Sequence, residues 1–127
     1  MTVKARRLLI MGTGLLAALC LLAPAASADC AKDSKGEVYC GGGRCVSDRT
    51  GVVWCARAYE GDAQVTRDGR VLCGTGQCEK NLAGEIFCSS KKGGAVLKDS
   101  QGRVRCYGKC EPATAERCEN APADSST

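Results

Sequence analysis

The chain has 127 residues, among them 11 Cys and 16 Gly but no His, and its formal net charge is +4. The lack of His removes the commonest general base and the commonest nitrogen ligand of zinc, which excludes most hydrolase mechanisms. Lys4, Arg6 and Arg7 supply three of the positive charges, so the chain from Asp29 onward has a net charge of only +1 and no basic footprint for nucleic acid.

The first 28 residues have the features of a cleavable secretory signal. The three basic residues precede an apolar run from Leu8 to Leu22, and Ala26-Ser27-Ala28 provides small residues at both positions that signal peptidase recognises. This run is shorter than the roughly 20 residues that span a bilayer, and no other long apolar run follows. We therefore predict cleavage after Ala28, no membrane span afterwards, and a secreted or periplasmic protein.

The region after the signal is rich in cysteine and poor in residues that build a core. Its ten cysteines are Cys30, Cys40, Cys45, Cys55, Cys73, Cys78, Cys88, Cys106, Cys110 and Cys118. It has only 13 Val, Ile, Leu and Phe residues. Burying each returns roughly 1.5 to 3 kcal/mol, whereas ordering any residue costs roughly 1.5 kcal/mol. Because export compartments are oxidising, we predict that disulfides hold the fold together.

The cysteines and glycines reveal an internal repeat of 33 residues. The repeated cysteines are Cys40 with Cys73, Cys45 with Cys78, and Cys55 with Cys88. One unit occurs five times and consists of a polar turn, a glycine, a short run of alternating apolar residues and a cysteine. The stretches from the glycine to the cysteine are 36–40, 51–55, 69–73, 84–88 and 102–106. Each run is typical of the second strand of a β-hairpin. The sequence thus predicts a small disulfide-rich all-β domain of tandem hairpins over 29–118, with little or no helix, and a disordered tail over 119–127.

Four of the turns place Asp or Asn three residues before the glycine. These residues are Asp33, Asp48, Asn81 and Asp99. The spacing is typical of a type I turn followed by a left-handed glycine in a three-residue hairpin loop. The remaining turn, 66–69, is compatible with the same geometry or with a tight Asp-Gly turn.

Such loops place three pairs of cysteines directly opposite one another, within disulfide reach. The pairs are Cys30 with Cys40, Cys45 with Cys55, and Cys78 with Cys88. Ala63 and Val96 stand opposite the other two hairpin cysteines, so one scheme adds Cys73 with Cys106 and Cys110 with Cys118. A rival scheme closes the short loops and joins Cys40 to Cys45, Cys73 to Cys78 and Cys106 to Cys110. The repeat is compatible with both.

On the strand face opposite the cysteines, one position recurs in every hairpin. It holds Tyr39, Trp54, Leu72, Phe87 and Arg105, which we call the row. If the hairpins stack in register, these residues line up and can form a binding face for sugars or for a partner protein, since Trp and Tyr anchor such surfaces. The alternative is that the row is the second layer of a thin core.

Two longer segments between hairpins, 56–62 and 89–95, are equivalent under the repeat and carry Arg57 in one case and Lys91 and Lys92 in the other. A basic residue in an exposed, disulfide-held loop is what an inhibitor of trypsin-like proteases presents. The alternative is a solvated connection that tolerates charge.

The chain has no phosphate loop, dinucleotide fingerprint or G-x-S-x-G motif, and we expect neither enzymatic activity nor a cofactor or metal. The leading hypothesis is an exported module that binds a protein or a cell-envelope polymer. The alternative is a secreted effector or protease inhibitor that acts through the two loops. A third hypothesis is metal sequestration by reduced thiols.

Overall fold

The computed structural model describes residues 28–126, which form short antiparallel strands and one 3-10 turn. Five hairpins follow one another along the chain, which confirms the predicted small disulfide-rich all-β fold. They are β1 (Asp29–Lys32) with β2 (Val38–Gly41), β3 (Cys45–Ser47) with β4 (Val53–Ala56), β5 (Ala63–Val65) with β6 (Val71–Cys73), β7 (Cys78–Lys80) with β8 (Ile86–Ser89), and β9 (Val96–Lys98) with β10 (Val104–Cys106). All but the last residue of the predicted signal peptide lie outside the described range. No helix within 28–126 is long and apolar enough to cross a membrane.

The five turns share one geometry, which includes the turn at 66–69 that the sequence left undecided. In the first turn the Asp33 N–H donates to the Glu37 carbonyl at 2.9 Å, and Gly36 has a φ of 86°. Asp33 Oδ1 also accepts the backbone N–H groups of Lys35 and Glu37. The side-chain oxygens of the other turns accept equivalent bonds, with Thr66 in the place of Asp or Asn. Side-chain capping and a left-handed glycine therefore fix each hairpin locally.

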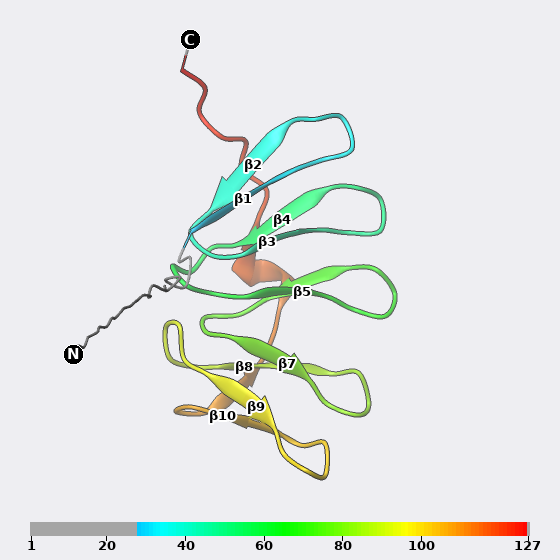
Figure 1. Cartoon of the computed structure of the whole chain (residues 1–127), viewed down its shortest axis with the longest axis vertical. Coiled ribbons are helices and arrows are strands. Elements are labelled where there is room, and N and C mark those ends of the chain that lie inside the picture. The colour runs from blue at the N-terminus through cyan, green and yellow to red at the C-terminus, as the bar shows by residue number, and fades with distance from the viewer. Residues whose placement is uncertain (1–27, 127) are drawn as a thin grey trace, which may run out of the picture.

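The hairpins stack face to face in successive layers (Figure 1). The row residue of each of the first three hairpins packs on a buried cluster that contains the cysteines of the next hairpin. Tyr39 contacts the buried cluster of Cys45, Val53 and Cys55 in the second hairpin. Trp54 contacts a cluster that contains Cys73 of the third hairpin. The core is therefore a series of thin layers in which disulfides replace large apolar side chains.

The residue after each second-strand cysteine is small wherever another hairpin covers it. The four covered positions are Gly41, Ala56, Gly74 and Ser89. A Cβ atom on Gly74 would overlap the Cys88 sulfur, so the close approach of the layers requires glycine there. In the fifth hairpin the same position is Tyr107, which is 68% exposed.

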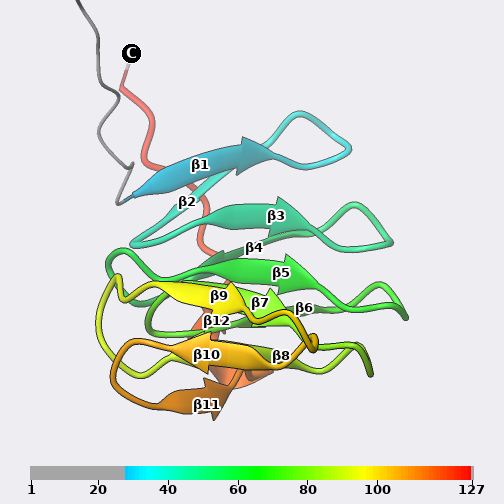
Figure 2. The same cartoon turned by 60° about the horizontal axis from the view of Figure 1, so that its bottom comes forward.

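The chain after the fifth hairpin runs back along the whole stack, and we call residues 110–123 the strap. It comprises β11 (Cys110–Pro112), η1 (Ala115–Arg117), β12 (Cys118–Glu119) and the residues between and after them. β11 pairs with β8, Thr114 bridges to Cys73 of β6, β12 pairs with β4, and Pro122 bridges to Tyr39 of β2. Figure 2 shows β11 beside the last hairpins, and in Figure 1 the strap leads back to the first.

Residues 119–123, which the sequence assigns to a disordered tail, instead bond to the first two hairpins. The Asn120 side chain donates to the Val53 carbonyl at 2.7 Å, and the Ala123 N–H donates to the Val38 carbonyl at 2.9 Å. The Cys40 N–H donates to the Ala121 carbonyl. The strap thus supplies backbone partners to the outer edges of β2 and β4, which an uncapped hairpin would expose.

The three disulfides predicted within hairpins are confirmed, with opposed Cα atoms 3.9 to 4.0 Å apart. The other two predicted pairs, Cys73 with Cys106 and Cys110 with Cys118, are wrong. The strap carries Cys118 past the third hairpin, where it joins Cys73, and Cys106 joins Cys110. The rival scheme is right for that last pair. It is wrong for Cys40 with Cys45 and for Cys73 with Cys78, because three of these cysteines pair within their own hairpins and Cys73 pairs with the strap.

Candidate functional site

The row residues occupy equivalent places in the five second strands. Tyr39, Trp54, Leu72 and Phe87 are half-buried, and Arg105 is exposed. The first three pack against buried clusters of the following hairpin, as a second core layer does. Phe87 belongs to none of the clusters found within 28–126. Most of the row therefore has a packing role, and only part of each side chain faces solvent.

Three row residues, Tyr39 among them, are held by the aspartate of their own turn, six positions earlier. Trp54 Nε1 donates to Asp48 Oδ2 at 3.1 Å, and Arg105 Nε donates to Asp99 Oδ2 at 3.2 Å. These bonds position the polar tip of each row side chain at the turn end of the stack. The other two row residues, Leu72 and Phe87, are apolar, and their turns begin with Thr and Asn instead of Asp.

These contacts shift the titration of the groups involved. Hydrogen bonds from Thr50 and Trp54 hold the pKa of Asp48 at about 2, below its ordinary value of 3.8. Backbone hydrogen bonds from Arg103 and Gln101, with the Arg105 side chain, hold the pKa of Asp99 at about 2. Partial burial raises the pKa of Tyr39, and the charge of Asp33 adds to this effect. The two aspartates are therefore anchors for the row and remain ionised at neutral pH.

The five hairpin turns lie one above another and form a column. Three adjoining hollows lie between this column of turns and the strap, and we call them together the groove. The first, of about 300 Å³, is lined by Trp54, Leu72 and Ala115. The second, of about 450 Å³, lies between Leu72 and Phe87. The third, of about 330 Å³, begins at Phe87 and ends at the fifth hairpin. Because neighbouring hollows share lining residues, the row residues Trp54, Leu72 and Phe87 form the floor of one groove along the stack.

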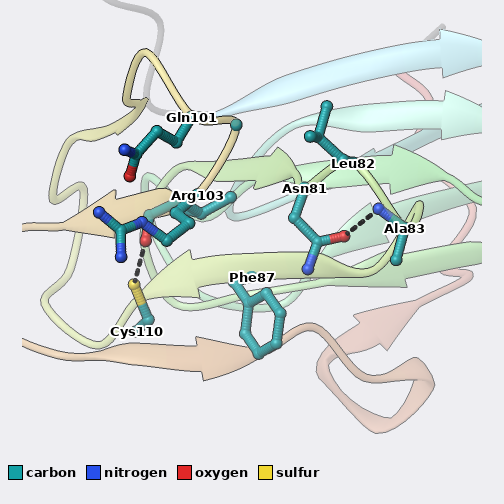
Figure 3. A pocket seen from close by; sticks show the side chains of 9 residues that line it. Asn81, Leu82, Ala83, Phe87, Gln101, Arg103 and Cys110 are labelled. Atoms are coloured by element: carbon teal, nitrogen blue, oxygen red, sulfur yellow. Dashed lines mark hydrogen bonds between the residues drawn. The ribbon is translucent and has the colours of Figure 1, made fainter.

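Figure 3 shows the third hollow from close by. Phe87 lies between the turn that carries Leu82 on one side and Arg103 with Cys110 on the other. Leu82 is 73% exposed, and its side chain lies against Gly102 of the next turn. An exposed leucine next to a half-buried phenylalanine gives this end of the groove an apolar character, with an arginine at its rim.

Charged side chains of both signs line the groove on the turn side. Arg70 Nε forms an ion pair with Asp68 Oδ2 at 3.0 Å, and Arg103 Nε pairs with Asp99 at 3.2 Å. Hydrogen bonds from Thr66 and Arg70 lower the pKa of Asp68. The groove therefore combines an apolar floor with donors and acceptors at its edge, as ligand-binding sites commonly do.

The loops predicted to carry a basic inhibitory residue lie at the edge of the stack opposite the turns. Arg57 is bound to the strap, since its N–H donates to the Arg117 carbonyl and its Nε donates to the Glu116 carbonyl at 3.0 Å. Lys92 Nζ lies 5.8 Å from the centre of the Tyr59 ring. Lys91 is exposed and lies against Gly108. The structure thus brings these residues to one edge, and none of the three lines the groove.

Sequence reasoning missed the turn arginines, the strap and the exposed side chains of the last hairpin. Arg49 lies against Gly69 and Arg67 lies against Gly84, so each arginine packs its own turn against the following turn in the column. The sequence did contain a signal for the held row residues, because Tyr, Trp and Arg each follow a turn Asp by six positions. No comparable signal marks the strap, which lacks the repeat.

All ten cysteines in the described part of the chain are paired in disulfides. Within 28–126 there is also no cluster of three His, Cys, Asp or Glu side chains that could hold a metal ion. Comparison of the chain with known protein families, with curated protein sequences and with solved structures gives no match.

Proposed function

We propose that this chain is an exported, non-enzymatic binding module whose groove holds an extended protein segment or cell-envelope polymer. The observation that carries the proposal is the alignment of Trp54, Leu72 and Phe87 on the floor of three adjoining hollows. A ligand that follows the stack meets an apolar row residue at each of the second, third and fourth hairpins. Repeated sites of this kind suit a ligand that is itself extended, because each hairpin adds contact area without a deep cavity.

The build of the molecule supports an exported location. Five disulfides within one small domain are typical of extracellular or periplasmic proteins, where thiols oxidise. The leader-like composition of residues 1–28 agrees with this location. The finer assignment, cleavage after Ala28 and release or retention in a periplasm, is part of the proposal and is checked by the N-terminal sequence of the exported protein.

The groove is tested with the oxidised protein and defined polymers. The probes are insoluble peptidoglycan, chitin and cellulose in pelleting assays, and an array of extended peptides. Two variants remove groove contacts without touching a buried cluster: Phe87→Ser changes the floor, and Arg70→Gln changes the edge. Leu97→Ser is the matched control, because Leu97 is an exposed leucine outside the groove.

We expect one class of probe to bind the wild type and the Leu97→Ser variant, and to bind the Phe87→Ser and Arg70→Gln variants at least tenfold more weakly. Mass spectrometry after thiol alkylation confirms that each variant keeps five disulfides. Equal binding by all four proteins would place the site outside the groove, and the absence of binding to every probe would remove the support for a polymer or peptide ligand.

A further inference from the structure

The fifth hairpin ends the stack, and its row face is not covered by another hairpin. Leu97 and Tyr107 on this face are 74% and 68% exposed, and Arg105 lies between them across a shallow hollow. In the four covered hairpins the position of Tyr107 holds a small residue. The end of the stack therefore presents large apolar side chains where every other row face is packed, and such exposed apolar groups mark interaction sites.

This end of the molecule also carries an excess of positive charge. Residues 90–109 contain six Lys and Arg and a single Asp, which gives a formal charge of +5. The rest of the chain from Asp29 to Thr127 contains nine basic and thirteen acidic residues, a formal charge of −4. The stack therefore has a strong charge asymmetry along its length, although its total charge is close to zero.

Arg105 lines the same shallow hollow as Leu97 and Tyr107, and the other basic residues of 90–109 belong to the fifth hairpin or to the loops on either side of it. Arg103 and Arg105 both donate to Asp99 Oδ2, so one carboxylate is shared by two guanidinium groups. The Ser90 N–H donates to the Lys109 carbonyl, and the Lys109 N–H donates to Ser90 Oγ at 3.1 Å. These bonds join the loop that contains Lys91 to the loop after β10 and place Lys91 and Lys109 at the same end.

We infer that this end face docks the protein on an anionic lipid surface, with Leu97 and Tyr107 among the headgroups and the surrounding Lys and Arg side chains against lipid phosphates. Tyr is suited to the interface because its ring is apolar and its hydroxyl stays in water. A negative surface attracts the end that contains residues 90–109, whose formal charge is +5, so the charge asymmetry orients the protein before contact. This function is separate from the groove, because the hollow of the end face and the three hollows of the groove have no lining residue in common, and of the basic residues of 90–109 only Arg103 also lines the groove.

The shape of the face favours a membrane over a protein partner. The exposed area is the face of one hairpin with strands of three residues, and its hollow is shallow. A specific protein interface buries about 800 Å² on each partner and has well-packed anchor pockets. A planar lipid surface needs only a few apolar groups within a basic rim.

The test measures binding of the oxidised full chain to vesicles of phosphatidylglycerol and phosphatidylcholine, and to vesicles of phosphatidylcholine alone. A charge variant combines Lys91→Gln, Lys98→Gln and Lys109→Gln, and its matched control combines Lys32→Gln, Lys35→Gln and Lys80→Gln at the other hairpins. An apolar variant combines Leu97→Ser and Tyr107→Ser, and its control is Val52→Ser, at an exposed apolar residue of the second hairpin. A Tyr107→Trp variant reports insertion through quenching by brominated lipids.

We expect binding only to the anionic vesicles, with an affinity that falls as salt increases. The charge variant should bind roughly a hundredfold more weakly, about fivefold for each lysine, and the control triple should bind with at most a few-fold loss. The apolar variant should also bind more weakly than its Val52→Ser control.

Fluorescence quenching locates the contact on the end face. The indole introduced by Tyr107→Trp should be quenched by the brominated lipids, whereas Trp54 in the wild type should not. Equal binding of the two triple variants, or no binding to anionic vesicles, would overturn the inference. Binding to poly-L-glutamate without vesicle binding would assign the face to an acidic protein instead.

Discussion

Cys118, in the strap, is bonded to Cys73 in the third hairpin across 45 residues of chain. Both cysteines are almost fully buried, in a cluster with Ala56, Ala63 and Val71. The bond therefore fixes the strap to the middle of the stack, whereas the disulfides within hairpins each close a turn.

Removal of this disulfide should be the most costly of the five. The chain-entropy relation gives about 4 kcal/mol for a loop of this length and about 2 kcal/mol for the short loop between Cys106 and Cys110. We expect the double variant Cys73→Ala and Cys118→Ala to lose about 4 kcal/mol in denaturant unfolding, against about 2 kcal/mol for Cys106→Ala and Cys110→Ala. Equal losses would mean that the strap contributes no long-range constraint.

The strap beyond Cys118 should also contribute to stability. Truncation after Cys118 removes the bonds of Asn120, Ala121 and Ala123 to the first two hairpins. Each of these hydrogen bonds contributes about 1 kcal/mol or less to stability, so the free energy of unfolding should fall by about 2 kcal/mol. Truncation after Ala123 is the matched control and should leave it unchanged. If both truncations have the same stability, residues 119–123 are not bound in solution.

Acid should weaken the fold in a defined range. The folded pKa values of Asp48 and Asp99 are about 2, below the ordinary value of 3.8. A lowered pKa means that the ionised carboxylate stabilises the fold, fully above about pH 4 and progressively less as the pH falls to about 2. The melting temperature should therefore fall over this interval.

The matched variant replaces both aspartates with Asn, which the fourth turn already uses at Asn81. This variant should have a lower melting temperature at neutral pH and a smaller fall between about pH 4 and pH 2. An unchanged pH dependence would assign the acid sensitivity to other carboxylates.

Row residues should differ in their effect on stability. Trp54 packs on a buried cluster and donates to Asp48, so Trp54→Ala should cost about 3 kcal/mol or more. Phe87 lies on the groove floor outside the buried clusters, and Phe87→Ala should cost about 1 kcal/mol. Thermal and denaturant unfolding of the oxidised variants measures both. A larger loss for Phe87→Ala would show that the layer between the fourth and fifth hairpins is packed as tightly as the others.

The hairpins could be predicted because everything that defines them is local. Asp33 and Gly36 lie three residues apart and set the register that brings Cys30 opposite Cys40. The course of the strap depends on contacts between residues far apart in sequence, such as Thr114 with Cys73, and these are mainly backbone bonds that leave no side-chain pattern. The pairing of Cys73 was missed for this reason.

The row could be placed from the sequence, but its surroundings could not. Periodicity identifies Trp54 and Phe87 as equivalent, whereas their burial depends on which hairpin covers them and where the strap passes. The charge of residues 90–109 is visible in the sequence. Only the stacking order shows that Leu97 and Tyr107 lie beside it on an uncovered face.

The strap follows all five hairpins in the sequence, yet it contacts the first of them. During synthesis the outer strand edges of the first two hairpins stay open until the strap is added, and Cys73 has no partner until Cys118 follows. The four disulfides between cysteines at most ten residues apart can close in order as the chain is synthesised. Four disulfides therefore join cysteines close in sequence, whereas the bond between Cys73 and Cys118 depends on the strap, and Cys73 is available for thiol exchange until the strap is in place.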